Sequence, residues 1–399
     1  MRVLVLNCGS SSVKYQLINM SDKSVMAKGL VEKIGLEDSV LIHKAINKDG
    51  FRLDAYIADH GKAIKMIIDA LVDVEHGAID DLSQIDAVGH RIVQGASVFP
   101  HPVIVDDDVV KKIADLAILA PLHNGPAVCG IEACRKNMPN KPMVVVFDTS
   151  FHQTMPPSSY MYGIPYEYYE KYAVRRYGFH GTSHRYVCNR AAQFVGKPIE
   201  ELKIISCHLG NGSSLAAVKY GRVYDTSMGF TPAAGLLMGS RCGDLDPSII
   251  PFLLEKEGFT PKELSDMFNK KSGLLGISGV SSDLRHVTDA AKAGNERAQL
   301  ALDMFVKRII QYIGAYTLQM EGLDVLVFTA GIGENSIESR ENICKKCRVL
   351  GLKLDEEANN CVGIEKEITQ KGSRVRAFVI HTNEELMIAE DTMRLVTAL

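Results

Sequence analysis

The sequence predicts an α/β protein built from two domains of related fold, and three observations support this prediction. The chain has 399 residues, which is too long for one ordinary hydrophobic core and suits two or three domains. Short apolar segments rich in β-branched residues alternate with amphipathic segments along the whole chain, a pattern typical of sheets covered by helices. One strand-turn-strand pattern occurs twice, about 200 residues apart.

The repeated pattern comprises an apolar strand, a Gly-Ser turn and a second strand that runs back antiparallel. Its two copies are LVLNCGSSSVKYQLI near the start of the chain and ISCHLGNGSSLAAVK at 205–219. A boundary after VVVFDTSFHQTMP, where Pro156 and Pro157 interrupt regular structure, would place one copy in each domain. We therefore expect two lobes that each offer a Gly-Ser hairpin tip to a cleft.

In chain order, seven segments are predicted strands because each is short, rich in β-branched residues and bounded by turn formers. They are RVLVLN (2–7), VKYQLI (13–18), IDAVGHRIV (85–93), PMVVVFD (142–148), LKIISCHL (202–209), SLAAVKY (214–220) and LDVLVFTA (323–330). Helices are predicted at 60–75, 107–119, 181–195, 295–320 and 384–397. The fourth helix is expected to lie in the core, because apolar residues recur at helical spacing through Leu302, Phe305, Ile309 and Tyr312.

Composition and charge exclude several classes of protein. Apolar residues make up 46% of the chain and charged residues 23%, as in a folded globular protein, and no segment is long and apolar enough to cross a membrane. The opening MRVLVLNCGSSS is typical of a first strand rather than a signal peptide, so a cytoplasmic protein is expected. A net charge of −3 with interspersed signs gives no basic tract, so neither nucleic acid nor membrane is an expected partner.

The cysteines indicate reduced thiols. There are nine of them, an odd number without a paired framework. Cys344 and Cys347 form a C-x-x-C, but no second pair lies at the spacing of a zinc site.

The two Gly-Ser turns are candidate phosphate-binding loops. Such tips expose backbone N–H groups and hydroxyls to a phosphate, and glycine lets the backbone approach closely. Asn7 or Asn211 accompanies each turn, although either turn alone is also explained as an ordinary hairpin. A third glycine-rich strand end, AGIGENS, precedes a predicted helix start at Asn335 or Ser336. Neither a P-loop nor a G-x-G-x-x-G occurs at these turns, which favours a two-lobed nucleotide site.

Three charged side chains stand where a site is expected. Arg91 lies at a predicted strand end in GHRIVQG, and Arg241 lies in the glycine-rich GLLMGSRCGDLDP. Each arginine would form either a structural ion pair or one half of a bidentate anion clamp. Asp148 ends an apolar strand, where it would either cap the DTS turn or hold Mg²⁺ beside a polyphosphate.

The last predicted helix begins with TNEE, the pattern of a capping box. Thr382 would cap the helix and Glu385 would return the hydrogen bond. The capping box accounts for Glu385 but not for Glu384, which therefore stays a candidate site residue.

The segment RRYGFHGTSH (175–184) places His180 and His184 four residues apart at the start of a predicted helix. This spacing occurs in zinc motifs, but no glutamate stands where H-E-x-x-H needs one and no third ligand is evident. Ser183 lacks the nucleophile elbow of a hydrolase. An imidazole donor at a helix N-terminus can instead stabilise negative charge on a transferring group, with Phe179 as an apolar wall for a small substrate.

Given these residues, the sequence resembles the acetate and propionate kinase family of the sugar kinase, Hsp70 and actin superfamily. The motifs NCGSSSVK, HRIVQGA, FDTSFHQTMP, RRYGFHGTSH, HLGNGSS, DTSMGFTP, GSRCGDLDP and AGIGENS follow the family order, and the resemblance spans 1–399. It implies two lobes of duplicated actin-like (ribonuclease H-like) fold around a nucleotide cleft. These lobes would be 1–150, completed by the helix at 384–399, and 151–383, which would carry most nucleotide contacts.

The resemblance also implies a reaction and a set of site residues. The reaction is reversible in-line phosphoryl transfer from ATP to acetate, giving acetyl phosphate and ADP, in a homodimer that uses Mg²⁺ or Mn²⁺. The implied catalytic residues are Arg91, Asp148, His180 and Arg241, and the implied metal residues are Asn7 and Glu384. The implied apolar pocket for the acetate methyl comprises Val93, Leu122, Phe179 and Pro232. The implied nucleotide contacts are Lys14, His208, Asn211, Gly212, Asp283, Arg285, Gly331, Ile332 and Asn335.

A carboxylate acceptor separates this reaction from that of a sugar kinase. Its pKa is about 4, so it is already ionised at neutral pH and needs no general base. Two alternatives stay open. An actin-like or Hsp70-like protein would hydrolyse ATP without any carboxylate. A kinase for propionate or butyrate would differ only in pocket depth, where one methylene is worth about 1–3 kcal/mol.

Overall fold

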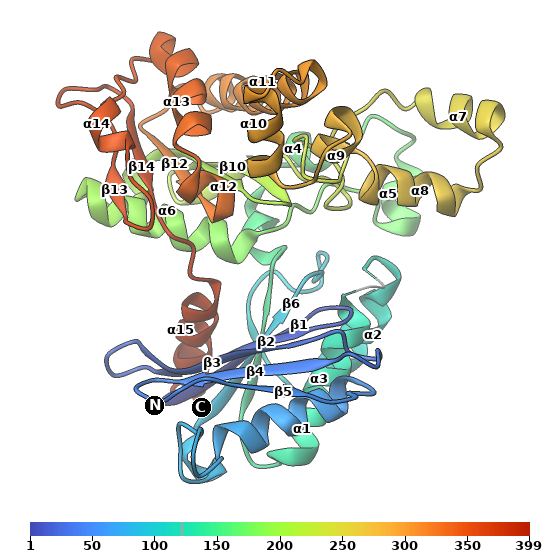
Figure 1. Ribbon diagram of the computed structural model, residues 1–399, viewed down its shortest axis with the longest axis vertical. Helices are drawn as coiled ribbons and strands as arrows, with labels where there is room; N and C mark the ends of the chain where they lie inside the picture. The colour runs from blue at the N-terminus through green and yellow to red at the C-terminus, as the bar shows by residue number, and fades with distance from the viewer. Residues whose placement is uncertain (121–122) are drawn as a thin grey trace. The chain divides into compact units, whose positions relative to one another are not determined.

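The computed structural model describes residues 1–120 and 123–399, which form two compact units (Figure 1). The first unit comprises Met1–Phe151 together with Asn383–Leu399, and the second comprises His152–Thr382. Each unit contains its own sheet with helices packed on it. The predicted α/β class is therefore confirmed.

The first unit is built on an eight-stranded sheet with the order β5-β4-β3-β2-β1-β6-β8-β7. β1 to β5 form an antiparallel meander, whereas β6 runs parallel to β1 and β8 runs parallel to β6. The strands are β1 (Arg2–Cys8), β2 (Val13–Asn19), β3 (Ser24–Glu32), β4 (Val40–Ala45), β5 (Phe51–Asp54), β6 (Ala87–Ile92), β7 (Val103–Ile104) and β8 (Met143–Phe147).

Helices cover both faces of this sheet, which explains why β1 is a continuous apolar run rather than an alternating one. Leu4 and Leu6 of β1 pack in a core with the helices α1 (His60–Leu71) and α3 (Asn124–Asn137). Val3 and Val5, which point to the opposite face, pack against α15 (Glu384–Val396). The C-terminal helix therefore belongs to the first unit. The remaining helical segments of this unit are α2 (Asp107–Asp115) and the 3₁₀ turns Leu82–Gln84 and Leu116–Ile118.

The second unit repeats the plan of the first around a six-stranded sheet with the order β11-β10-β9-β12-β14-β13. β9 and β10 form an antiparallel hairpin like β1 and β2, and β12 and β14 run parallel to β9 as β6 and β8 run parallel to β1. The predicted strand-turn-strand repeat is thus confirmed. The strands are β9 (Lys203–Leu209), β10 (Ser213–Lys219), β11 (Arg222–Thr226), β12 (Val325–Thr329), β13 (Lys366–Glu367) and β14 (Arg376–Val379).

The core of the second unit forms around α11 (Glu296–Gln319), whose Phe305 and Ile309 are fully buried, as the apolar spacing predicted. Within the described ranges, no helix has both the length and the apolar character needed to cross a membrane. The other helices are α4 (Pro157–Tyr160), α5 (Glu167–Tyr172), α6 (Gly181–Val195), α7 (Ile249–Glu257), α8 (Pro261–Lys270), α9 (Gly273–Ser278), α10 (Leu284–Lys292), α12 (Ala330–Asn335), α13 (Ile337–Lys346) and α14 (Glu356–Asn359). Further 3₁₀ turns lie at Ser150–Thr154, Ile199–Glu201 and Cys347–Leu350.

Two helix starts differ from the sequence predictions. The capping box predicted at Thr382 is wrong: Asn383 caps α15 and accepts a hydrogen bond from the Leu386 amide, because asparagine caps at least as well as threonine. Thr382 instead donates its hydroxyl to Ser183. Ser336 caps α13 as predicted, but the preceding AGIGEN folds into the short helix α12 rather than an open glycine turn.

Candidate active site

The first hairpin tip places an amide side chain beside a cation. Asn7 lies one residue before the end of β1, opposite Lys14 of β2, and a Gly9 N–H to Ser12 carbonyl hydrogen bond of 2.8 Å closes the turn. The Arg91 side chain reaches from the neighbouring parallel strand β6, and its Nη1 donates to Asn7 Oδ1 at 3.2 Å. The pairing of β1 with β6 therefore joins two candidate residues that are 84 positions apart in sequence.

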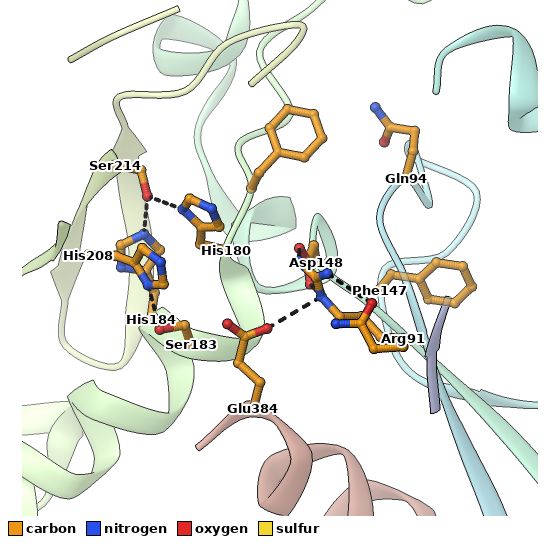
Figure 2. Close-up of polar contacts among 12 residues, drawn as sticks. Arg91, Gln94, Phe147, Asp148, His180, Ser183, His184, His208, Ser214 and Glu384 are labelled. Atoms are coloured by element: carbon orange, nitrogen blue, oxygen red, sulfur yellow. Dashed lines mark hydrogen bonds and ion pairs between the residues drawn. The ribbon is translucent and has the colours of Figure 1, made fainter. Parts of the chain in front are cut away.

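Arg91 also holds two carboxylates, as Figure 2 shows. Its Nε and Nη2 donate to the two Asp148 oxygens at 3.0 and 2.5 Å, and its Nε lies 3.3 Å from Glu384 Oε2. Asp148 follows the end of β8, the parallel neighbour of β6, and Glu384 opens α15. We call Asn7, Arg91, Asp148 and Glu384 the ionic cluster.

Burial shapes the charges of the ionic cluster. The Asp148 side chain is 1% exposed and the Glu384 side chain 19% exposed. Burial raises the pKa of Glu384, Arg91 lowers it, and Asp148 raises it again. The net result is a pKa of about 7. Burial disfavours the Arg91 cation, but Asp148 and Glu384 outweigh burial and raise the pKa of Arg91 above its usual value. Arg91 is therefore always charged, whereas Glu384 changes charge near neutral pH.

Cys8, beside the same turn, is a packing residue. Burial raises the pKa of its thiol to about 12, so the reactive thiolate is scarce at neutral pH. A Cβ on Gly130 of α3 would lie only 2.5 Å from Cys8 Sγ, so glycine at that position lets α3 approach the end of β1. All nine cysteines lie in the described residues, and each is a free thiol.

The second hairpin contacts imidazoles and hydroxyls instead of an arginine paired with carboxylates. His180 stands at the N-cap of α6 in the left-handed region, with φ of 58°, a conformation that is costly for a side chain other than glycine. Its Nδ1 lies 2.9 Å from Ser214 Oγ of β10, and the same hydroxyl lies 2.8 Å from His184 Nε2 (Figure 2). His184 Nδ1 lies 2.9 Å from Ser206 Oγ of β9. Four side chains thus form a continuous hydrogen-bonded chain.

A second set of contacts orients His208, the last but one residue of β9, which pairs with Ser214 across the hairpin. Ser183 Oγ lies 2.8 Å from His208 Nδ1 and accepts the Thr382 hydroxyl at 2.7 Å. The His180 and His208 rings stack with centroids 4.0 Å apart and an interplanar angle of 22°. We call His180, Ser183, His184, Ser206, His208, Ser214 and Thr382 the histidine-serine network.

Arg241 lies close to one edge of this network. A Cβ on Gly212 would lie 3.2 Å from Arg241 Nη1 and 3.7 Å from His180 Nε2, so the glycine keeps the space beside both donors open. Arg241 Nη1 also lies 3.4 Å from the Pro232 carbonyl, and burial lowers the pKa of Arg241. The Gly-Ser tip, one arginine and one imidazole therefore share a single locality in the second unit.

A cavity of about 720 Å³ opens in the second unit, a volume typical of small-molecule sites. Its lining includes six of the nine predicted nucleotide residues, namely Asn211, Asp283, Arg285, Gly331, Ile332 and Asn335. Asp283 caps α10 and holds Arg285 in an ion pair of 2.6 Å at the rim. The predicted residues outside the cavity lining are Lys14, in the first unit, and His208 and Gly212.

The predicted acetate-methyl pocket is only partly described. Val93 follows β6 in the first unit, and Phe179 and Pro232 lie in the second, where Phe179 is buried. The predicted residue Leu122 lies outside the described residues.

The hydroxyl side chains that contact the histidines are not predicted from the sequence. Ser206 and Ser214 have the pattern of ordinary strand residues, and Ser183 stands out only as a candidate nucleophile. The available signal was serine inside an apolar run, as in IISCHL, because a fully buried hydroxyl needs a partner.

Comparison with known proteins gives full-length matches. A family model described as the Acetokinase family matches residues 2–390. The acetate kinase of Moorella thermoacetica is 58% identical over 398 residues and that of Halothermothrix orenii 54% over 396, with at least 99% of each chain covered. Among solved structures, an acetate kinase of Porphyromonas gingivalis superposes with a TM-score of 0.96 at 47% identity, covering 99% of both chains. A propionate kinase of Francisella tularensis gives 0.91 at 42% identity, again covering 99% of both.

Proposed function

The chain belongs to the acetokinase family, and we propose on that basis that it transfers a phosphoryl group reversibly between ATP and acetate. The observation that carries this proposal is the match at 58% identity to an acetate kinase, which covers both chains in full. The products are acetyl phosphate and ADP. The enzyme is thus a carboxylate kinase.

The cavity of the second unit suits the nucleoside end of ATP. Ile332 supplies an apolar surface, while Asp283 and Asn335 supply polar groups that can orient the base and ribose. Asn335 Nδ2 donates to the Gly331 carbonyl at 2.8 Å, a contact within α12 that orients the Asn335 side chain. We assign Asn211 and Gly212 to the phosphate chain because they form the hairpin tip.

Two arginines and one histidine are assigned to the transferring phosphoryl group. Its transition state is loose and spreads negative charge over three equatorial oxygens, so positioned cations and N–H donors stabilise it. Arg91 and Arg241 supply the charge, and His180 supplies a neutral donor. The acetate carboxylate is already ionised and needs no base.

The ionic cluster fits a hard divalent cation. Asn7 offers an amide oxygen, and Asp148 and Glu384 offer carboxylate oxygens, which are the donors that Mg²⁺ and Mn²⁺ prefer. We assign these three residues to hold the cation directly or through water. When bound, it would neutralise negative charge on the phosphate oxygens.

Several further assignments complete the proposal. The two units correspond to two actin-like lobes, and the chain works as a homodimer in the cytoplasm. We assign Val93, Phe179 and Pro232 to contact the acetate methyl. These assignments rest on the family relationship.

Hydroxylamine trapping of the acyl phosphate tests the proposed function. Purified protein is incubated with Mg-ATP and acetate, propionate or butyrate in parallel, with a control that lacks acid. We expect the largest yield with acetate. A larger yield with propionate or butyrate would keep the chemistry and change the substrate, whereas no acyl phosphate from any acid would overturn the proposal.

A further inference from the structure

The histidine-serine network contains a chain whose two middle members, His184 and Ser214, each have two polar contacts. The chain runs Ser206–His184–Ser214–His180, with successive distances of 2.9, 2.8 and 2.9 Å. All three residues behind His180 are fully buried, so water does not compete for these contacts. The hydrogen positions along the chain must therefore agree with one another.

The central hydroxyl fixes this agreement. Ser214 has one hydrogen and two lone pairs and touches two imidazole nitrogens, so it either donates to one ring and accepts from the other or accepts from both. Accepting from both would leave Nε2 of a neutral His180 without a hydrogen, as the reverse order below does. If Ser214 donates to His180 Nδ1, it must accept from His184 Nε2, and Ser206 must then donate to His184 Nδ1. That order leaves His180 with its hydrogen on Nε2. The reverse order leaves Nε2 with a lone pair that cannot bind an anion.

Two features favour neutral rings. Burial lowers the pKa of His184 well below 6.5, with smaller contributions from His152 and His208. His180 stacks on His208 at 4.0 Å, a spacing at which two cations would repel strongly. His208 has a similar hydrogen-bond donor at its Nδ1. Because Thr382 donates to Ser183, the Ser183 hydroxyl can donate its own hydrogen to His208 Nδ1.

The Nε2 edge of His180 faces the place where a phosphoryl group is assigned. This edge lies beside Gly212, within 3.7 Å of the position that a Cβ there would occupy, and Arg241 Nη1 borders the same position at 3.2 Å. A hydrogen on Nε2 is therefore useful there, and a lone pair is not.

We propose that Ser214 and His184 are positioning residues that keep His180 neutral with its hydrogen on Nε2, ready to donate to an anionic phosphoryl oxygen. This inference rests on the proposed function, because it concerns the same transferring group. The relay moves no proton during the reaction; it fixes the tautomer beforehand, as the carboxylate does in a catalytic triad.

The direct test is nitrogen-15 NMR of histidine-labelled protein with Mg-ATP and no acetate, with the His180 signals assigned by their loss in His180→Gln. We expect His180 to carry its hydrogen on Nε2. A hydrogen on Nδ1, or a doubly protonated ring at neutral pH, would overturn the inference without any Ser214 variant.

Kinetics of Ser214→Ala supply the second test. We expect kcat to fall about 10- to 100-fold, because the His180 ring stays in place and only its preferred tautomer is lost. This loss should not exceed the loss caused by removing a donor altogether, and KM for ATP and acetate should be nearly unchanged. Ser214→Thr keeps the hydroxyl and should restore kcat to within about threefold of the parent. Ser278→Ala removes a buried serine hydroxyl of α9 far from the histidines in sequence and should leave kcat unchanged.

The outcomes separate the inference from the proposed function. If the parent forms acyl phosphate but Ser214→Ala keeps both its kcat and the His180 tautomer, the inference fails and the proposed function stands. If Ser214→Ala loses activity while the tautomer is unchanged, Ser214 only packs, which also overturns the inference. If the parent forms no acyl phosphate, the proposed function fails. The His180 tautomer measured in the parent still shows whether Ser214 and His184 keep the hydrogen on Nε2.

Discussion

The two units share one sheet plan but place different chemistry at matching positions. In the first unit, the last but one pair before the hairpin tip is Asn7 and Lys14; in the second, the corresponding pair is His208 and Ser214. The first hairpin contributes to an ionic cluster, and the second contributes to a network of imidazoles and hydroxyls. The sheet therefore determines where site residues stand, and the side chains determine what they do.

This difference has an energetic consequence. Removing one partner of a buried ion pair leaves an uncompensated charge and costs about 3–5 kcal/mol, whereas a neutral hydrogen bond contributes about 1 kcal/mol. Variants of the ionic cluster should therefore lose several kcal/mol of stability together with activity, whereas variants of the second unit should lose about 1 kcal/mol or less.

Removing either arginine should have the largest effect. We expect Arg91→Ala and Arg241→Ala each to lower kcat about 10³-fold, by analogy with arginine fingers. Arg91→Ala should also lower the free energy of unfolding by about 3–5 kcal/mol, because Asp148 stays buried without its bidentate partner. Arg241→Ala should leave stability almost unchanged. Steady-state kinetics and urea titration measure the two effects.

The control for the arginine variants is Arg52→Ala, which removes an exposed ion pair with Asp54 and should change neither quantity. A loss of kcat under about tenfold in a folded variant would remove that arginine from the mechanism. Equal stability losses in both variants would erase the contrast between the units.

Magnesium dependence should follow the protonation of Glu384. Since burial raises its pKa to about 7, the carboxyl is increasingly neutral below pH 7 and a poorer cation ligand. We expect KM for Mg²⁺ to rise by up to about tenfold per pH unit as the pH falls below 7. Glu384→Gln should weaken Mg²⁺ binding and flatten this dependence. Glu390→Gln, on the same helix, should keep the parent slope; a parent without any slope would contradict the assignment.

The cavity of the second unit should separate nucleotide binding from chemistry. Asp283→Ala should raise KM for ATP about tenfold with kcat nearly unchanged, because the side chain acts on bound and activated nucleotide alike. It should also cost about 1 kcal/mol of stability, because Asp283 caps α10. Asn295→Ala removes the cap of α11 outside the cavity lining, so it should cost similar stability without changing KM. If Asn295→Ala raised KM for ATP as much as Asp283→Ala does, that result would argue against a nucleotide site in the cavity.

Acid should act on the histidine-serine network through His184. Its pKa is depressed by burial, so the neutral ring contributes stability above its unfolded pKa of about 6.5, and this contribution is lost as the pH falls. We expect His184→Gln to reduce the slope of the unfolding free energy between pH 6.5 and 5 by at most about 1.4 kcal/mol per pH unit. The exposed His286→Gln should leave the slope unchanged; an unchanged slope in His184→Gln would show that the ring titrates normally.

The sequence predicted elements whose signals are local. The strands beside CGSSS and GNGSS were predictable because turn chemistry and β-branched residues stand next to each other, and α11 was predictable from its apolar spacing. Contacts between distant segments were not. No local pattern brings Glu384 to Arg91 across 293 positions, since that contact depends on α15 packing back onto the first sheet.

The candidate site divides in the same way. Charged residues in apolar or glycine-rich surroundings, such as Asp148 and Arg241, stand out in the sequence because burial makes them costly. Ser214 does not stand out in the sequence, because serine is common in strands. Its role depends on the pairing of β10 with β9 and on the left-handed backbone conformation of His180. Roles carried by hydroxyls therefore emerge only from the structure.

The most direct test of the account is the stoichiometry of ADP and acyl phosphate in one reaction vessel, with and without acetate. If acetate is the phosphoryl acceptor, one acyl phosphate should form for each ADP when acetate is present. Almost no ADP should form without acetate, because the phosphoryl group then has no acceptor. ADP that accumulates equally without acetate would contradict the account and would place the chain with nucleotide hydrolases of the actin-like class.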